Sequence, residues 1–119
     1  MTTDNSTQPH ALQVNGLAIP VDPEGYLRHL EDWNEAVATQ LAAQEAIQLT
    51  EAHWEILRLL RQFYQQFEMS PAMRPLIKAI TAELGSDKGK SIYLMSLFPG
   101  SPAKLASKIA GLPKPTNCL

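Results

Sequence analysis

The chain has only one cysteine among its 119 residues, so it cannot form an intramolecular disulfide. Residues 1–11 lack the basic and apolar regions of a secretory signal peptide, and their Thr, Asn, Ser and Gln content predicts a disordered leader. No run approaches the roughly 18 apolar residues that a membrane-spanning helix needs. These absences exclude a disulfide-stapled secreted scaffold and predict a soluble, cytoplasmic protein that has no membrane partner.

Acidic side chains are missing from the C-terminal part of the chain. All 12 Asp and Glu residues lie at or before Asp87, whereas residues 88–119 carry five lysines. A positive field favours the ionised form of a nearby thiol, so this basic segment predicts a reactive setting for the single cysteine, Cys118. Each lysine taken singly is equally consistent with a solvated surface.

The sequence has no constellation typical of a metal or cofactor site. His10, His29 and His53 are dispersed, and the carboxylates fall on predicted helix surfaces. A glycine-rich loop that would cradle phosphate groups is also lacking. We therefore expect neither a metal nor a cofactor, and we interpret His53 as a structural residue.

The first structural element that the sequence indicates is a β-hairpin. Two short alternating apolar runs flank Asn15-Gly16, a pair that favours the positive φ angles of a type I′ turn. Residues 12–19 are therefore predicted to form a hairpin. Residues 20–25 are rich in turn formers, and a brief third strand is expected near residues 26–28.

The chain then becomes helical in pattern. Asp32 or Asn34 is predicted to cap a helix that runs to about Glu45. The strongest helix is predicted over residues 51–67, with Thr50 as its N-cap. Its apolar positions, which we expect in the core, are Trp54, Leu57, Leu60, Phe63, Tyr64 and Phe67.

A further helix is predicted before the glycine at position 85. Ser70-Pro71 is typical of an N-cap followed by proline at the first helical position, and Gly85 is a stop signal. Pro75 conflicts with that start because it has no N–H to donate to the preceding turn. Either a kink at Pro75 or a helix that begins near Arg74 is therefore expected.

Two short helices complete the pattern, over residues 91–98 and 102–110. The fold class predicted is α+β and mainly helical, with an N-terminal β-hairpin or small meander packed on about five helices. Residues 12–111 form the predicted domain. Residues 112–119 form a flexible C-terminal arm that carries Cys118.

The length and proline content of the arm suit a segment that brings its cysteine to the active site of a partner. Seven residues separate the last predicted helix from Cys118, and they span at most about 23 Å at roughly 3.3 Å per residue. Pro113 and Pro115 favour extended geometry. Lys108 and Lys114 are candidates for stabilising the thiolate or persulfide anion or for guiding the arm. On spacing alone, an incidental thiol or a disulfide-linked dimer remains an open alternative.

Residues 108–115, followed by a penultimate Cys118, resemble the C-terminal signature of the DsrC/TusE family of sulfur carriers. Further matches in the order and spacing of that family lie at residues 22–27, 50–54, 63–64, 70–72, 93–94 and 97–99. The resemblance extends from about residue 12 to residue 119. Sites that depart from the family's pattern and flank the arm are Ile92, Leu105 and Gly100-Ser101.

The resemblance implies a sulfur carrier that works within a relay and not as a stand-alone enzyme. Members that act with dissimilatory sulfite reductase have a second arm cysteine where this chain has Ser107, so the resemblance is closer to the TusE-like members. It implies that Cys118 holds persulfide sulfur. It also implies a TusBCD-like donor complex and an MnmA-like tRNA thiolase as acceptor, for 2-thiouridine formation in tRNA.

Two alternative functions stay open. One is a DsrC-like accessory or regulatory protein of sulfur metabolism, against which Ser107 argues. The other is a helix-turn-helix DNA-binding protein that uses the helices at residues 51–67 and 71–84. That second helix offers only Arg74 and Lys78 as basic groups, so direct DNA binding is not expected.

Overall fold

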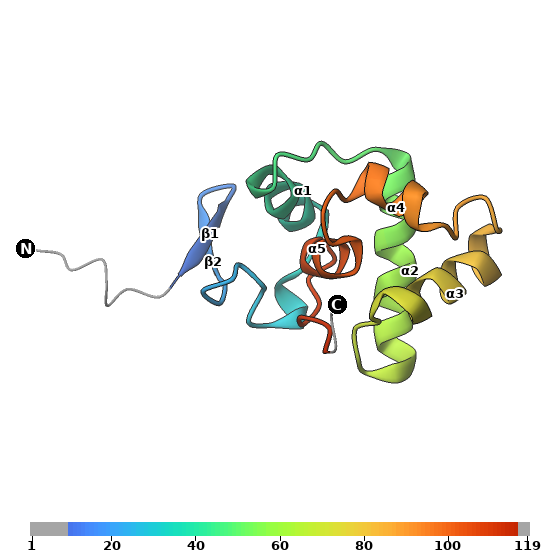
Figure 1. The fold of residues 1–119 in the computed structure, drawn as a ribbon. Coiled ribbons are helices and arrows are strands. Elements are labelled where there is room, and N and C mark those ends of the chain that lie inside the picture. The colour runs from blue at the N-terminus through green and yellow to red at the C-terminus, as the bar shows by residue number, and fades with distance from the viewer. Residues whose placement is uncertain (1–9, 117–119) are drawn as a thin grey trace, which may run out of the picture.

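A computed structural model describes residues 10–116, which form a β-hairpin followed by an array of helices (Figure 1). The elements are β1 (Ala11–Val14), β2 (Leu17–Pro20), the 3-10 turn η2 (Leu30–Asp32), α1 (Glu35–Gln44), α2 (Glu51–Phe67), α3 (Met73–Leu84), α4 (Ser91–Leu97) and α5 (Pro102–Ile109). The predicted α+β fold is confirmed. None of the helices in the described part is both long and apolar enough to span a membrane.

The hairpin is built as the Asn-Gly pair predicts. Asn15 and Gly16 have φ angles of 50° and 84°, and β1 pairs with β2 in antiparallel register. Leu12 and Val14 turn their side chains inward, and β1 packs against α1. The expected third strand is reduced to a single β-bridge between Val21 and Leu27.

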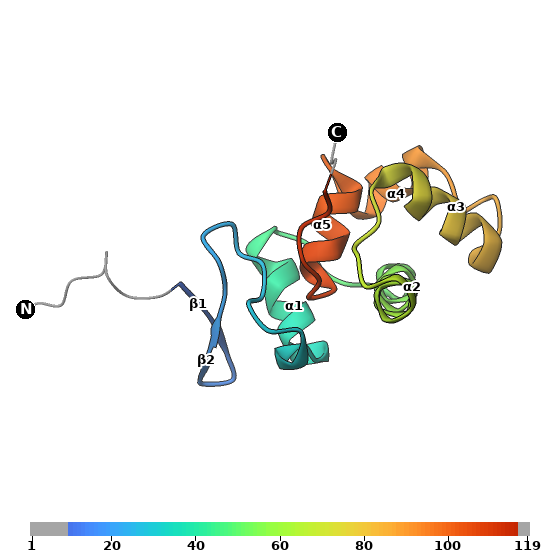
Figure 2. The ribbon, with the colours of Figure 1, turned by 90° about the horizontal axis from the view of Figure 1, so that it is seen from below.

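Helix α5 lies between α1 and α2 (Figures 1 and 2) and also contacts α3 and α4. Ala106 and Ile109 on this short helix are fully buried in the core. Leu112, just beyond the helix, is only 1% exposed. The arm therefore starts from the centre of the packed domain and not from its edge.

Helix α2 has the predicted bounds, but part of its apolar face lies outside the core. Ile56, Leu57, Leu59 and Leu60 are buried, whereas Phe67 is 52% exposed, so the prediction that Phe67 lies in the core is wrong. The helix extends beyond the core at its C-terminal end, which leaves this ring without covering elements. Trp54 and Tyr64 are half-buried against the core. Phe63 is half-buried and packs against Phe67 with the two rings tilted and their centroids 4.6 Å apart.

The structure shows where α1 and α3 begin, two positions for which the sequence allowed alternatives. Asn34 caps α1, and its Oδ1 accepts a hydrogen bond of 2.8 Å from the Val37 N–H. Helix α3 begins at Met73, which places Pro75 in the first turn, where its missing N–H has no intrahelical acceptor. The predicted Ser70-Pro71 cap is therefore wrong, and the Ser70 hydroxyl serves the C-terminal arm instead.

Candidate functional site at the base of the C-terminal arm

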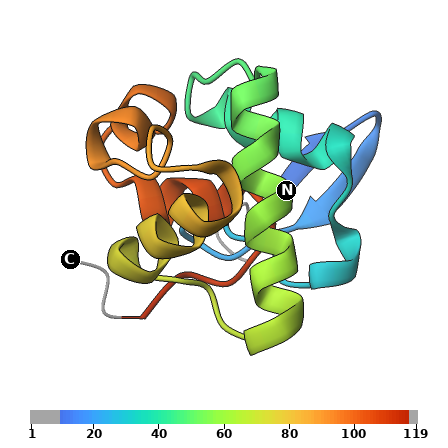
Figure 3. The same ribbon diagram turned by 90° about the vertical axis from the view of Figure 1, so that its right-hand side faces the viewer.

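The predicted functional residue, Cys118, lies outside the described residues 10–116. The candidate site is therefore the set of residues that holds the chain leading to it. Residues 112–116, called here the arm base, leave the C-terminal end of α5 and run back beneath that helix toward its N-terminal end (Figures 2 and 3). The following contacts fix this path.

Helix α5 ends at a glycine that fits against the indole of Trp33. Gly111 has a φ of 75°, a conformation that glycine adopts without steric cost. A Cβ atom at this position would lie 2.4 Å from Cδ1 of Trp33, well inside van der Waals contact. The Trp33 Nε1–H donates a 2.9 Å hydrogen bond to the Ile109 carbonyl oxygen. Gly111 is thus required both for the turn and for the close approach of the ring.

Arg61, on α2, satisfies the next free carbonyl of α5. Its Nη1–H donates a 2.8 Å hydrogen bond to the Ala110 carbonyl oxygen. Its guanidinium also lies 4.3 Å from the centroid of the Trp33 ring, in cation–π geometry. Burial lowers the pKa of Arg61 from its ordinary value, but a guanidinium still stays charged at physiological pH. We call these two side chains the Trp33–Arg61 clamp.

The arm base itself is seated on the domain. The Leu112 N–H donates a 2.9 Å hydrogen bond to the Ser107 carbonyl oxygen. The Ser70 hydroxyl donates to the carbonyl oxygen of Pro113, which ties the α2–α3 connection to the arm. Pro115 is buried. The described part of the predicted arm is therefore packed on the body as far as Pro115.

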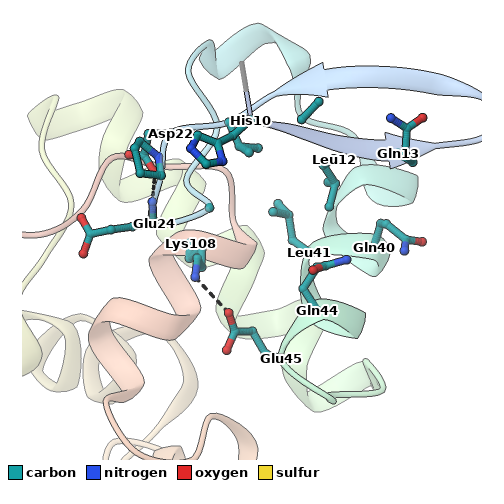
Figure 4. A pocket seen from close by; sticks show the side chains of 14 residues that line it. His10, Leu12, Gln13, Asp22, Glu24, Gln40, Leu41, Gln44, Glu45 and Lys108 are labelled. Carbon is teal, nitrogen blue, oxygen red and sulfur yellow. Dashed lines mark hydrogen bonds and ion pairs between the residues drawn. The ribbon is translucent and has the colours of Figure 1, made fainter. Parts of the chain in front are cut away.

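The two lysines predicted to support the thiol each form an ion pair with a glutamate. Lys114 Nζ lies 3.1 Å from Glu24 Oε2, and these side chains are 41% and 59% exposed. Lys108 Nζ lies 2.9 Å from Glu45 Oε2, with exposures of 19% and 32%, and 5.5 Å from the ring centroid of Tyr26. Figure 4 shows Lys108 and Glu45 pointing toward one another in a pocket of about 380 Å³ lined by the hairpin, α1 and α5. A role for either lysine toward the thiol stays a prediction.

Ser107 occupies the position at which the sequence resemblance places a second cysteine in other family members. It is fully buried on α5. Within the described residues, its Oγ atom has no hydrogen-bond partner. A hydroxyl cannot form a disulfide or hold a persulfide, so any sulfur chemistry of this chain has to proceed through one thiol.

His53 is a structural residue, as predicted. Its Nδ1 accepts a 3.0 Å hydrogen bond from the Thr50 N–H, which leaves Nε2–H to donate to the Leu97 carbonyl oxygen at 2.9 Å. The imidazole also packs edge-on against Phe98, with ring centroids 5.2 Å apart. These contacts connect the start of α2 to the end of α4. His53 is thus fully engaged in the fold.

The sequence reasoning missed Trp33, Arg61 and Ser70 as residues of the site. Each meets the end of α5 or the arm base across a long stretch of chain, and only the start of the arm carried a local signal, the stop glycine. Within residues 10–116, no group of three or more His, Cys, Asp or Glu side chains is placed to hold a metal ion.

Comparison with known protein families gives one assignment over nearly the whole chain. A family model described as DsrC like protein matches residues 13–119. The protein named Sulfurtransferase TusE homolog from Haemophilus influenzae is 52% identical over 108 residues, or 91% of this chain and 99% of that protein. Sulfurtransferase TusE from Yersinia pestis is 54% identical over 108 residues, with the same coverage of both chains.

Solved structures agree with these relatives. The NMR structure of Allochromatium vinosum DsrC has a TM-score of 0.85 and 47% identity, and the match covers 94% of this chain and 100% of that chain. The crystal structure of the oxidized gamma-subunit of the dissimilatory sulfite reductase (DsrC) from Archaeoglobus fulgidus has a TM-score of 0.80 and 40% identity. That match covers 92% of this chain and 99% of the other. The similarity thus extends over the complete domain.

Proposed function

Because the chain belongs to the DsrC-like protein family, we propose that it carries sulfur as a persulfide on Cys118. The sulfurtransferase names of its relatives and its DsrC fold support a sulfur carrier. The observation that carries the proposal is the combination of one cysteine in the chain and a firmly seated arm base that leads to it. The clamp fixes the starting point of the arm, and the thiol is two residues beyond its described end.

The transfer step needs no external oxidant or reductant. The Cys118 thiolate attacks the outer sulfur of a donor cysteine persulfide, and its electron pair forms the new S–S bond. The S–S bond of the donor breaks, and the donor cysteine leaves as a thiolate that takes up a proton from solvent. The transferred sulfur keeps its oxidation state. In the second transfer, the outer sulfur of the Cys118 persulfide passes to an acceptor thiol in the same way.

The partners proposed are the two ends of a sulfur relay. A TusBCD-like complex donates the sulfur, and an MnmA-like tRNA thiolase accepts it for 2-thiouridine formation in the cytoplasm. Support for this route is the resemblance to TusE-like members and the presence of Ser107, which restricts the chain to a single-thiol carrier.

A second candidate function is an accessory role in sulfur metabolism beside a sulfite reductase. The printed name of one structural neighbour, the gamma-subunit of the dissimilatory sulfite reductase, favours it. Ser107 disfavours any version of this role that closes a disulfide within the arm, because only one thiol is available.

Mass spectrometry of the intact protein tests the proposal. After incubation with glutathione persulfide, we expect the wild-type chain to gain one sulfur mass, and we expect reduction to remove it. The Cys118→Ser variant is the control and should gain nothing. Equal sulfur uptake by that variant would overturn the proposal. Tight, salt-sensitive binding of duplex DNA without sulfur uptake would replace it with the helix-turn-helix alternative.

A further inference from the structure

The proposed sulfur carrier has a short reach beyond the point where its arm base is seated. Cys118 is two residues beyond Thr116, the last described residue, and two residues span at most about 7 Å. A donor that exchanges sulfur with Cys118 while the arm base stays seated must therefore bring its own cysteine close to this end of the arm. Its surface then has to cover the part of the domain that lies there.

The surface at that end of the molecule belongs to three helices. The arm base ends beneath the start of α3, on the same side of the molecule as the N-terminal end of α5 and as α4, which lies above them (Figures 2 and 3). A groove of about 380 Å³ lies between these elements. Its lining includes Met73 from α3, Met95 from α4 and Lys104 from α5.

Apolar side chains are exposed on α4. Leu94 faces the core, whereas Ile92 is 79% and Met95 is 44% exposed. Ile92 is also one of the positions at which the chain departs from the family's pattern. Large apolar side chains that are grouped on a surface mark interaction sites more often than isolated ones do. Methionine adapts its shape to a partner, which favours the same use for Met73 and Met95.

The charge beside this groove is positive, although Lys104 also lines a second pocket with Glu24 and Glu45, whose carboxylates are paired with Lys114 and Lys108. Lys90 is exposed and Lys104 half-buried, and neither forms an ion pair with any described residue. The other lysines of the C-terminal part are neutralised in the pairs Lys88–Glu55, Lys108–Glu45 and Lys114–Glu24. Residues 88–119 contain no acidic side chain that would offset the two unpaired lysines. The groove thus has an apolar centre and a basic rim.

We propose that the surface formed by Met73, Lys90, Ile92, Met95 and Lys104, called here the α4–α5 surface, is the docking site of the sulfur donor. The donor that fits it presents an apolar patch with acidic residues at its edge, next to the persulfide that Cys118 attacks. Three observations carry this inference: the short reach of the arm, the exposed apolar side chains and the unpaired lysines. It rests on the proposed function of Cys118.

A second apolar groove provides the matched control. It lies between α2 and α3, has a volume of about 490 Å³ and is lined by residues such as Phe67 and Lys78. No residue of α4, α5 or the arm base lines it. Phe67 is 52% exposed, close to the 44% of Met95, so a glutamate at either position remains accessible to solvent.

The experiment compares two double variants, Met95→Glu with Lys104→Glu and Phe67→Glu with Lys78→Glu. Sulfur uptake by Cys118 is measured with persulfide-charged TusBCD complex and, separately, with glutathione persulfide. We expect the first double variant to take up sulfur from TusBCD about thirtyfold more slowly than wild type, as loss of one interface hot spot would cause. We expect the second double variant to match wild type. Both should react normally with glutathione persulfide, which does not need a docking surface.

Each outcome has a distinct meaning. Normal uptake from TusBCD by the first double variant, or an equal loss in both, would overturn the docking site. Failure of wild type to react with glutathione persulfide would instead overturn the proposed function of Cys118. If the first double variant unfolds at a lower temperature than wild type, Ile92→Glu replaces it, because this side chain is 79% exposed. Added salt tests the contribution of the lysines to docking. It should slow sulfur uptake from TusBCD more in wild type than in the Lys104→Glu variant.

Discussion

The inner and the outer parts of the arm's attachment to the domain differ in their contacts. At the inner part, Gly111 and Leu112 are buried, and the carbonyls that precede them are bound by the Trp33–Arg61 clamp. At the outer part, Pro113 and Lys114 are exposed and are held by one serine hydroxyl and one surface ion pair, and Pro115 is the one buried residue. The domain thus fixes where the arm begins far more strongly than where it lies. The predictions below test this difference.

The largest effect is expected at the inner part, for Gly111→Ala. The added methyl group would meet the Trp33 ring in a backbone conformation that disfavours a side chain, so we expect a loss of about 3 kcal/mol in the free energy of unfolding. Gly16→Ala is the control, because Gly16 has a φ of 84° but open space around it, and it should cost about 1 kcal/mol. Urea unfolding measures both. Equal losses would show that the approach of Trp33 contributes nothing.

A smaller loss is expected when the clamp loses its charged member. Arg61→Met removes the hydrogen bond to the Ala110 carbonyl and the cation–π contact with Trp33, and it should lower the free energy of unfolding by about 2 kcal/mol. The matched control is Arg58→Met on the same helix. Arg58 is 54% exposed and, among residues 10–116, forms an ion pair with Glu51 alone, so its loss should cost less than about 0.5 kcal/mol.

At the outer part, Ser70→Ala should loosen the arm base while the inner part stays fixed. The loss of its hydrogen bond to Pro113, which is only partly buried, should lower the free energy of unfolding by about 1 kcal/mol. Hydrogen exchange measures the local effect. The Leu112 amide, whose hydrogen bond to Ser107 is unaffected, should exchange as slowly as in wild type. Faster exchange at Leu112 would contradict the division into two parts.

The smallest effect is expected for Lys114→Met. Its ion pair with Glu24 is exposed at both ends, so we expect a change of less than about 0.5 kcal/mol in the free energy of unfolding, and less still at high salt. Thermal unfolding at two salt concentrations measures this change. A loss of more than about 1 kcal/mol would mean that the outer part is held as firmly as the inner part. The rate of sulfur uptake by the same variant tests the predicted support of the thiol by Lys114.

Much of the secondary structure was predictable because its boundaries are set by neighbouring residues. The Asn15-Gly16 pair, Thr50 and Gly85 each act through their own backbone or that of the next few residues, and the structure places each where the sequence predicts. Ser70 shows the limit of this reasoning. It has the local appearance of a cap, but a partner 43 positions away uses its hydroxyl instead.

The clamp was not predictable, because its contacts join positions far apart in the chain. Trp33 and Ile109 are separated by 76 positions, and Arg61 and Ala110 by 49. No periodic pattern or short motif records which tertiary partner a tryptophan or an arginine will find. The prediction that Phe67 lies in the core was wrong for a related reason. Helical spacing predicts which residues share a face but not where the neighbouring elements end. The position of Cys118 itself was evident from the sequence alone.

The burial of Pro115 determines how far the thiol can enter a partner's active site before contacts between the arm and the domain must break. A donor or acceptor whose cysteine lies in a shallow depression can meet the thiol with the arm base left in place. A partner with a deeper active site must first detach Pro115, then the Ser70 contact with Pro113, before the span of about 20 Å from the buried Leu112 to Cys118 is available. Each step into a deeper site weakens binding by the contacts that it breaks. The seating of a few residues therefore ranks partners by how far their cysteines lie below the surface.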